Sequence, residues 1–270
     1  MKATFLIDNI ASEGLKGEWG LSVYIEHNGT KILLDAGTTG DFVNNADSLG
    51  INLAEVDLAV LSHAHYDHAN GFVKFFERNT KAPLILREGS KENCYHKFVI
   101  TKKYIGVKKG MLEEYSDRIQ YASGDCQIAD GIFLIPHKSP NLQRIGRKAG
   151  MYIIKDGKLV PDDFSHEQSL VVSTAKGLVI FNSCSHGGAD NIINEIAATF
   201  PGEKIYALVG GFHLFLSSDA YVRKLADRIK ATGIEKILTG HCTGNKAYDI
   251  LKVNLGDAAE QIRTGLIFEV

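Results

Sequence analysis

Residues 61–71 read LSHAHYDHANG and hold three histidines and one aspartate within six positions. The segment before them, residues 56–61 (VDLAVL), is apolar and has the composition of a buried strand. The segment after them, residues 72–77 (FVKFFE), has its apolar residues at helical spacing. We therefore expect the polar cluster on a strand-to-helix turn, at the carboxyl end of a strand, where open α/β sheets bind their ligands.

The four polar side chains of this turn have the spacing of a metal site. His63 and His65 are two residues apart, so in extended chain they point the same way. Asp67 and His68 follow where the chain bends, so they can face a second point nearby. Imidazole suits zinc, copper, iron and nickel, and a carboxylate among imidazoles favours a hard or borderline dication. A plain surface turn has no need of three imidazoles, so we interpret the cluster as metal-binding.

The motif SHAHYDHANG resembles the HxHxDH signature of the metallo-beta-lactamase fold superfamily. Residues 29–37 (GTKILLDAG) are similar to its early strand and aspartate-containing turn, and residues 239–244 (TGHCTG) to its late motif. SCSHGG (183–188), GGFHL (210–214) and GHCTG (240–244) resemble more narrowly the branch of dihydropterin–ribofuranosylaminobenzene-phosphate synthase-like proteins. The resemblance runs from about Trp19 to the C-terminus and skips the middle of the chain.

This resemblance implies the fold. It predicts one domain over residues 1–270, of class α/β (α+β), built as a four-layer αββα sandwich with the site on one edge between the sheets. The pattern of strands and helices alone supports only a mixed α and β protein. Strands are expected at residues 2–7, 21–26, 31–35, 56–61, 82–86, 130–135, 151–154, 158–160, 168–174, 178–182, 205–209, 235–238 and 267–270. Helices are expected at residues 41–49, from about 70, at 189–200, at 218–232 and up to about 254.

The composition is ordinary for a globular protein, with 44% hydrophobic and 23% charged residues among 270. The net charge of −2 argues against a surface that coats nucleic acid. No apolar run reaches the roughly 20 residues that span a bilayer, and the first ten residues have the pattern of a strand, not of a signal peptide. The four cysteines form no CxxC pair, which favours a reducing compartment. We expect a cytoplasmic protein without a nucleic-acid or membrane partner, and a homo-oligomer is left open.

Residues 87–116 lack a compact pattern and carry seven lysines and arginines among aromatic residues. One interpretation is a solvated excursion. The other is an inserted lid over the metal site that offers cations to an anionic substrate, because long irregular connections are usually functional or mobile. In that case Lys102, Lys103 and Tyr104 would bind the substrate. Residues 137–148 are expected to form a loop that makes a second wall of the same opening.

Three further histidines follow strands elsewhere in the chain. His186 lies in SCSHGG, His213 in GGFHL and His241 in GHCTG. Polar residues that converge at strand ends are typical of a site on a rigid scaffold. Glycines flank His186 and His241, so little bulk blocks approach to them, and we interpret both as metal ligands.

The resemblance also implies a division of the ligands between two ions. One ion would be held by His63, His65 and a third histidine, and the other by Asp67, His68 and His241. The expected cofactor is one or two divalent metal ions, with zinc first and manganese or iron as alternatives.

The loop around residue 185 departs from the common superfamily pattern. The usual bridging aspartate is absent, and Cys184 occupies the nearest position, where a thiolate ligand and a small semi-buried residue are both open interpretations. His186 and His166 (in SHEQSL) compete for the third histidine of the first ion, and we prefer His186. Asp35 ends a strand near the expected site, so we expect it to orient a ligand histidine.

The chemistry follows from a dication with an open coordination position, which lowers the pKa of its bound water to about 7. Asp67, or a neighbouring group, is expected to orient that water or accept its proton. His213 lies outside the superfamily's ligand set, so we expect it to polarise the reacting oxygen of the substrate, with a structural histidine as the alternative.

Together these residues predict a metal-dependent hydrolase of a small anionic substrate, such as a phosphoester, an ester or a lactone. The alternative is a pterin-type condensing transferase like the synthases of the resembled branch, in which aromatic residues around 95–104 would stack on a ring. A catalytically idle binding domain fits poorly with a nearly intact ligand set. An iron redox role ranks low, because these residues include no separate flavin-binding domain.

Overall fold

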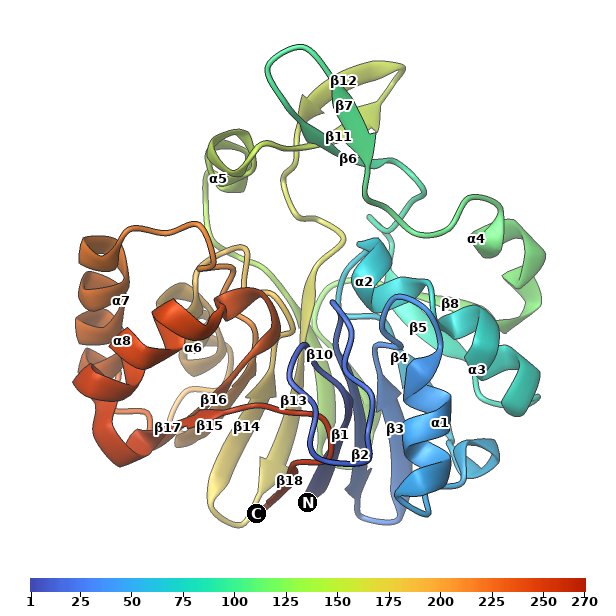
Figure 1. Ribbon diagram of the computed structural model, residues 1–270, viewed down its shortest axis with the longest axis horizontal. Coiled ribbons are helices and arrows are strands. Elements are labelled where there is room, and N and C mark those ends of the chain that lie inside the picture. Colours follow the sequence, from blue (N-terminus) through green and yellow to red (C-terminus); the bar gives the residue numbers. More distant parts are fainter.

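The computed structural model describes residues 1–270. Two seven-stranded sheets lie face to face, and a four-stranded sheet stands at one end of them, at the top of Figure 1. Helices cover the outer face of each large sheet, so the layers run helix, sheet, sheet, helix (Figure 1). The αββα sandwich expected from the sequence is confirmed. None of the helices combines the length and the apolar character that crossing a bilayer requires.

The first large sheet is built from the first half of the chain and its last strand. In spatial order its strands are β18 (Ile267–Glu269), β1 (Lys2–Ile7), β2 (Ser22–His27), β3 (Thr30–Leu34), β4 (Leu58–Val60), β5 (Leu84–Arg87) and β8 (Ile119–Ala122). The hairpin between β2 and β3 turns at Asn28 and Gly29, whose φ angles are 47° and 78°. A two-residue hairpin with a type I′ turn requires positive φ angles at both central residues, so the predicted Asn-Gly turn is confirmed.

The second large sheet is built from the part of the chain that follows residue 125. In spatial order its strands are β17 (Ala259–Gln261), β16 (Lys236–Thr239), β15 (Ile205–Gly210), β14 (Gly177–Phe181), β13 (Gln168–Thr174), β10 (Ile132–Pro136) and β9 (Cys126–Ala129). The strands from β14 to β17 pair in parallel, as do those from β3 to β8 in the first sheet. The carboxyl ends of these parallel strands therefore meet at one edge of the sandwich.

Helices α1 (Asp41–Ser48) and α3 (Phe72–Arg78) pack outside the first sheet, and α6 (Ala189–Thr199), α7 (Asp219–Ala231) and α8 (Asn245–Leu255) outside the second (Figure 1). The remaining α-helices are α2 (Tyr66–Ala69), α4 (Met111–Glu114) and α5 (Leu142–Ala149). Single 3₁₀ turns are η1 (Leu53–Glu55), η2 (Ser116–Arg118), η3 (His241–Thr243) and η4 (Gly256–Ala258).

Alternate side chains along the strands belong to different apolar cores, of which three are large. In β3, Ile32 and Leu34 belong to the core between the two sheets, whereas Leu33 belongs to the core under α1 and α3. In β14, Val179 faces the other sheet and Ile180 faces the core under α6, α7 and α8. Successive strand residues point to opposite faces, so strands covered on both sides are apolar throughout. This explains why the expected strands read as continuous apolar runs.

Two segments are more regular than the sequence predicted. Within residues 87–116, β6 (Cys94–Lys97) and β7 (Lys102–Tyr104) form a hairpin that joins β11 (Met151–Lys155) and β12 (Lys158–Pro161) in the four-stranded sheet. Within residues 137–148, where a loop was expected, the chain forms α5. Gly146 lowers the helix propensity of α5, but a Cβ there would lie 2.3 Å from the Asp162 carbonyl oxygen, so close packing requires the glycine. Whether residues 87–116 act as a lid stays a prediction.

Candidate metal centre

Side chains from both sheets converge at the edge where the parallel strands end. Five groups of buried residues have ligand atoms that all lie within 4.8 Å of one another, and two of these groups match the division that the resemblance implies. The first group comprises His63, His65 and His186, and the second comprises Asp67, His68 and His241. In each group, residues from the turn after β4 meet a histidine from the second sheet, as strand ends that share one edge allow.

The first group leaves three nitrogen atoms without partners. The Nε2 atoms of His63, His65 and His186 are buried and accept or donate no hydrogen bond. Burial and neighbouring imidazoles hold the pKa of both His63 and His65 well below its ordinary value, so their lone pairs are free. Since buried polar atoms almost always have a partner, three unpartnered nitrogens on residues whose ligand atoms lie within 4.8 Å of one another fit a metal ion.

Hydrogen bonds on the opposite ring nitrogen fix two of these three histidines, His63 and His186. The Nδ1 of His63 lies 2.8 Å from the Ser62 hydroxyl, which in turn donates to Asp35 at 2.7 Å. The Nδ1 of His186 bonds to the Glu167 carboxylate. A carboxylate or hydroxyl that holds Nδ1–H selects the tautomer whose Nε2 can bind a metal. The first group thus has the second layer of contacts that metal sites use.

The second group shows the same arrangement. The Nε2 atoms of His68 and His241 lie 3.1 Å apart, and the Asp67 carboxylate lies 3.4 Å from the Nε2 of His241. The Nδ1 of His68 lies 2.8 Å from Asp35, and that of His241 lies 3.2 Å from the Asn9 side-chain oxygen. With both Nδ1 atoms engaged, the two Nε2 atoms face each other beside a carboxylate, an arrangement that fits a second cation in place of the proton on His241.

Charge around Asp67 keeps it ionised. Burial alone would raise its pKa, but the neighbouring His68 and His241 hold the pKa of Asp67 well below its usual value. For His241, burial lowers the pKa, yet its contacts with Cys242 and Asp67 raise it to about 9. The second group therefore offers a carboxylate at neutral pH.

Asp35 has the position that the sequence predicted. Its carboxylate accepts from the Ser62 backbone N–H at 2.7 Å and from the Ser62 hydroxyl, and it holds His68. One buried carboxylate thus orients His63, through Ser62, and His68 directly. Its backbone is left-handed, with a φ of 57°.

Sequence reasoning missed three residues that support the ligands. Asn9 holds His241 and comes from the loop after β1, together with Asp8, which accepts from the His241 backbone N–H at 2.8 Å. Glu167 holds His186. The sequence held a signal for each, because Asp8 and Asn9 end an apolar strand and Glu167 lies next to His166. None of the three, however, has the spacing of a metal ligand.

Cys184 lies beside the second group. Its Sγ is 3.3 Å from the Nε2 of His68 and 3.4 Å from the Sγ of Cys242. Cys184 also forms a group with His63 and His68 in which the ligand atoms lie within 4.8 Å of one another, so its sulfur lies near residues of both ligand groups.

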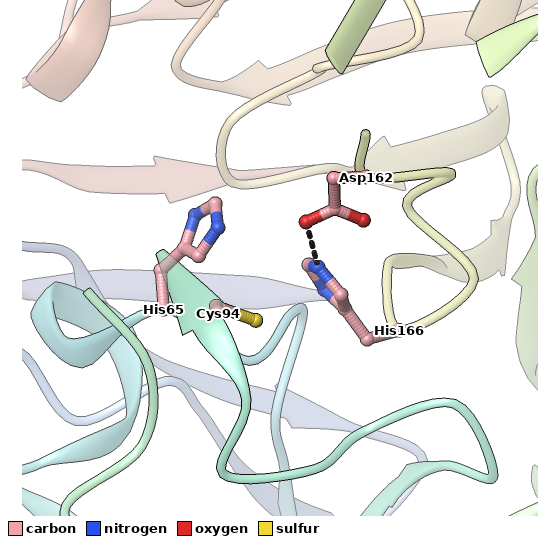
Figure 2. A group of neighbouring side chains, drawn as sticks. All are labelled: His65, Cys94, Asp162 and His166. Atoms are coloured by element: carbon pink, nitrogen blue, oxygen red, sulfur yellow. Dashed lines mark hydrogen bonds and ion pairs between the residues drawn. The ribbon is translucent and has the colours of Figure 1, made fainter. Parts of the chain in front are cut away.

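His166 belongs to a different cluster, drawn in Figure 2 with His65, Cys94 and Asp162. Its Nε2 lies 3.0 Å from the Asp162 carboxylate, the bond dashed in Figure 2. Its Nδ1 accepts from the Ala64 backbone N–H at 3.2 Å. Both ring nitrogens are engaged, so His166 has no lone pair for a metal, and the geometry favours His186 as the third histidine.

A buried chain of ion pairs lies behind His186. Glu167 also contacts His137, with 2.8 Å between carboxylate and Nε2, and the other nitrogen of His137 lies 3.2 Å from Glu195. Burial lowers the pKa of His137, but Glu167 and Glu195 outweigh it and raise the pKa to about 10. His137 is therefore a cation that neutralises the carboxylate behind a ligand candidate.

This pKa predicts a pH dependence of stability. The ordinary pKa of histidine is about 6.5, so the contribution of His137 is complete below that pH and is lost as the pH rises toward about 10, because the folded state retains the proton longer. We expect the free energy of unfolding of the metal-free protein to fall by a few kcal/mol across this range. Urea unfolding of wild type and His137→Gln at several pH values measures the contribution of His137 as the difference between their free energies of unfolding. All other titrating groups are present in both proteins. Parallel profiles for the two proteins would contradict it.

A cavity of about 420 Å³ opens onto both groups. Asp67, Cys184, His186 and other polar residues form its floor, and Trp19, Phe98 and Phe215 are among its apolar walls. A second hollow of about 570 Å³ adjoins it and shares the wall made by His186, His213, Ala149 and Leu216. An apolar pocket with a few convergent polar groups is the usual form of a small-molecule site.

His213 lies on the wall between the two hollows. Its ring centroid is 4.9 Å from that of His186, its Nδ1 is buried without a partner, and its φ is 49°. It is outside both ligand groups, as expected, and it can reach a molecule in either hollow.

Of the three residues predicted to bind substrate, the structure brings only Lys103 to the cavity. Lys103 pairs with His96 across the β6–β7 hairpin, and both line the cavity. Lys102 and Tyr104 lie on the opposite face because strand residues alternate. The Lys102 Nζ lies 4.8 Å from the Tyr95 ring centroid, and the Tyr104 hydroxyl donates to the Val107 carbonyl. The structure therefore places Lys102 and Tyr104 outside this cavity, and a role for them in substrate binding stays a prediction.

A model of the Metallo-beta-lactamase superfamily matches residues 20–169. The structure of Tm1679, described as a metal-dependent hydrolase of the beta-lactamase superfamily, has a TM-score of 0.86 and 31% identity, and the match covers 100% of this chain and 99% of that one.

Two proteins of Methanocaldococcus jannaschii are also similar. One is 28% identical over 93% of this chain and 89% of its own length and is named 7,8-dihydropterin-6-methyl-4-(beta-D-ribofuranosyl)-aminobenzene-5'-phosphate synthase. The other is an uncharacterized protein, 30% identical over 90% of each chain. The similarity extends over nearly the whole chain in each case.

Proposed function

Because the chain belongs to the metallo-beta-lactamase superfamily, we propose that it is a metal-dependent hydrolase of a small anionic substrate, such as a phosphoester, an ester or a lactone. The observation that carries the proposal is the set of three unpartnered Nε2 atoms, on His63, His65 and His186, beside an accessible cavity. A metal bound there supplies Lewis acidity and activates water at neutral pH.

The proposed ligands are those of the two groups, with Cys184 beside the second. Imidazole, carboxylate and thiolate together suit zinc, and manganese or iron remain alternatives when the thiolate is not used. In this proposal His63, His65 and His186 hold the first ion, and Asp67, His68 and His241 hold the second.

The chain's own groups then have distinct tasks. Asp67 is an ionised carboxylate at the floor of the cavity and can accept a proton from the attacking water. His213 lines both hollows and can donate from its ring to the reacting oxygen of the substrate. Lys103 faces the anionic group, and Trp19 and Phe215, whose rings meet edge to face at 5.5 Å, exclude water from one wall.

A condensing transferase is the second candidate. The observation in its favour is the pair of adjoining hollows, which share His186 and His213 and could hold two substrates side by side. The synthase from Methanocaldococcus jannaschii is a relative with a name of that class. The two candidates differ in whether water or a second organic molecule occupies the hollow lined by Ser217, Ser218 and Tyr221.

A substrate panel tests the proposal. Zinc-loaded protein should hydrolyse at least one phosphoester, ester or lactone and release phosphate or a phosphomonoester, a carboxylic acid or an alcohol, and removal of the metal with a chelator should abolish the release. Turnover that requires a second, amine-bearing organic substrate and releases pyrophosphate would support the transferase instead. Full turnover after complete metal removal would contradict both.

Substitutions of Lys103 and Lys102 provide a matched test of whether a lysine contacts the anionic group of the substrate. We expect Lys103→Ala to raise KM for anionic substrates about fivefold, since an exposed charge contact contributes up to about 1 kcal/mol. Lys102→Ala removes the same charge from the opposite face of the hairpin and should leave KM unchanged. Equal effects of the two substitutions would assign the lysines to general attraction and not to contact with the substrate.

A further inference from the structure

Two thiols meet at the floor of the cavity. Cys184 follows β14 and Cys242 follows β16, and their Sγ atoms lie 3.4 Å apart without a disulfide. Both residues are buried, with 3% and 1% of their surface exposed, yet both line the cavity. A small molecule that enters the cavity can therefore reach this pair.

The backbone around the pair leaves room for both sulfurs. A Cβ on Gly211 would lie 2.5 Å from the Cys242 Sγ, so the glycine is needed to accommodate the thiol. The His213 backbone N–H donates to the same sulfur at 3.2 Å. Cys242 is thus held toward Cys184 from two sides. The other cysteines, Cys94 and Cys126, do not line the cavity.

We propose that Cys184 and Cys242 form a redox-modification site, at which a peroxide converts the two thiols into a disulfide. The Sγ atoms need to approach by little more than 1 Å to reach the S–S bond length of about 2.05 Å. In the first step one thiol takes an oxygen atom from hydrogen peroxide and becomes a sulfenic acid. The O–O bond breaks, and one water molecule is released. In the second step the other sulfur displaces that oxygen as a second water, so the thiol pair loses two electrons and the peroxide gains them.

The bond would act on the metal centre. This consequence rests on the ligand set proposed above, whereas formation of the bond does not. The Cys184 sulfur lies 3.3 Å from the Nε2 of His68, so a bond to Cys242 leaves it no thiolate to offer to an ion beside the second group. The same bond joins the loop of His186 to the loop of His241. Oxidation should therefore lower the capacity for the second ion, and a bound ion should in turn slow oxidation.

Mass spectrometry after peroxide treatment tests the bond directly. Metal-free wild type should lose two alkylatable thiols and the mass of two hydrogen atoms, peptide mapping should join Cys184 to Cys242, and a dithiol reductant should restore both. The double variant Cys94→Ser with Cys126→Ser should behave like wild type. A disulfide through Cys94 or Cys126, or oxidation of single thiols to sulfinic acid without a cross-link, would overturn the proposal.

Metal content tests the consequence without any assay of turnover. Reduced wild type should bind more zinc per chain than oxidised wild type, and zinc-loaded protein should be oxidised at least several-fold more slowly than metal-free protein. Cys242→Ser retains Cys184 but cannot form the bond, so its zinc content should be insensitive to peroxide; Cys242→Ala replaces it if the serine variant does not fold. A disulfide that leaves zinc content unchanged would overturn the control of the metal centre, and it would do so whatever reaction the protein catalyses.

Discussion

In His65→Ala we expect turnover to fall by about 10³-fold or more, because a catalytic metal contributes several kcal/mol to the transition state and each ~1.4 kcal/mol is a factor of ten. Zinc content should fall by one ion per chain, measured by elemental analysis after dialysis. The fold should tolerate the change. The Nε2 of His65 has no partner, so its removal leaves no other buried group unsatisfied, and the side chain borders the cavity.

His166→Ala is the matched control, because it replaces the competing histidine in the neighbouring cluster of Figure 2. His166 bonds to Asp162 and to the Ala64 backbone, so its loss strands a buried carboxylate. We expect this variant to lose several kcal/mol of stability, as when one partner of a buried pair is removed, and to keep its zinc stoichiometry. Full zinc content in His65→Ala, or loss of zinc in His166→Ala at temperatures where it is folded, would reverse the assignment.

Glu167→Gln should damage both metal binding and stability. The carboxylate of Glu167 bonds to the His186 Nδ1, accepts from the His186 backbone N–H at 3.2 Å and pairs with His137. Burial would raise its pKa, but His186 and His137 hold the pKa of Glu167 well below its ordinary value, so the charge is present at neutral pH. A glutamine has one acceptor oxygen and no charge, and cannot serve both histidines.

We expect the zinc affinity of Glu167→Gln to fall about 10- to 100-fold, the usual effect of losing a residue that orients a ligand. The free energy of unfolding of the metal-free form should fall by about 3–5 kcal/mol, since the cation on His137 loses a buried partner. Competition with a zinc chelator and urea unfolding measure the two effects. Glu203→Gln, at an exposed position without an ion pair, is the control. Wild-type zinc affinity in Glu167→Gln would show that Glu167 supports the fold alone.

Much of the fold could be predicted from local patterns. Strands buried on both faces appear in the sequence as apolar runs. The hairpin at Asn28 and Gly29 could be predicted because these two residue types readily adopt the positive φ angles that the turn requires. Helix α5 could not be predicted, because Gly146 lowers its propensity and the reason for the glycine, the Asp162 carbonyl 2.3 Å from its Cβ position, lies in another segment. In the four-stranded sheet, β11 and β12 could be predicted, but β6 and β7 could not, because they depend on pairing between residues 94–96 and 151–153, which no local pattern reveals.

The candidate ligands could be found because metal sites demand particular side chains at strand ends. Their supporting residues could not, since a hydrogen bond to Nδ1 can come from any oxygen that the fold brings near. Asn9 and Glu167 illustrate this, as their partners lie 232 and 19 positions away along the chain. The choice of Lys103 over Lys102 depended on strand register, because one step along β7 changes the face.

Each ligand group takes residues from both large sheets, and this has a consequence for the lifetime of the protein. A metal ion bound by His65 and His186, or by His68 and His241, would fasten the two halves of the sandwich together at the edge where no strand pairing joins them. Its binding free energy would add to folding, by about 2.7 kcal/mol at a free-ion concentration 100 times the dissociation constant. The supply of metal in the cell would then set how long each molecule survives proteolysis, and not only how fast it works.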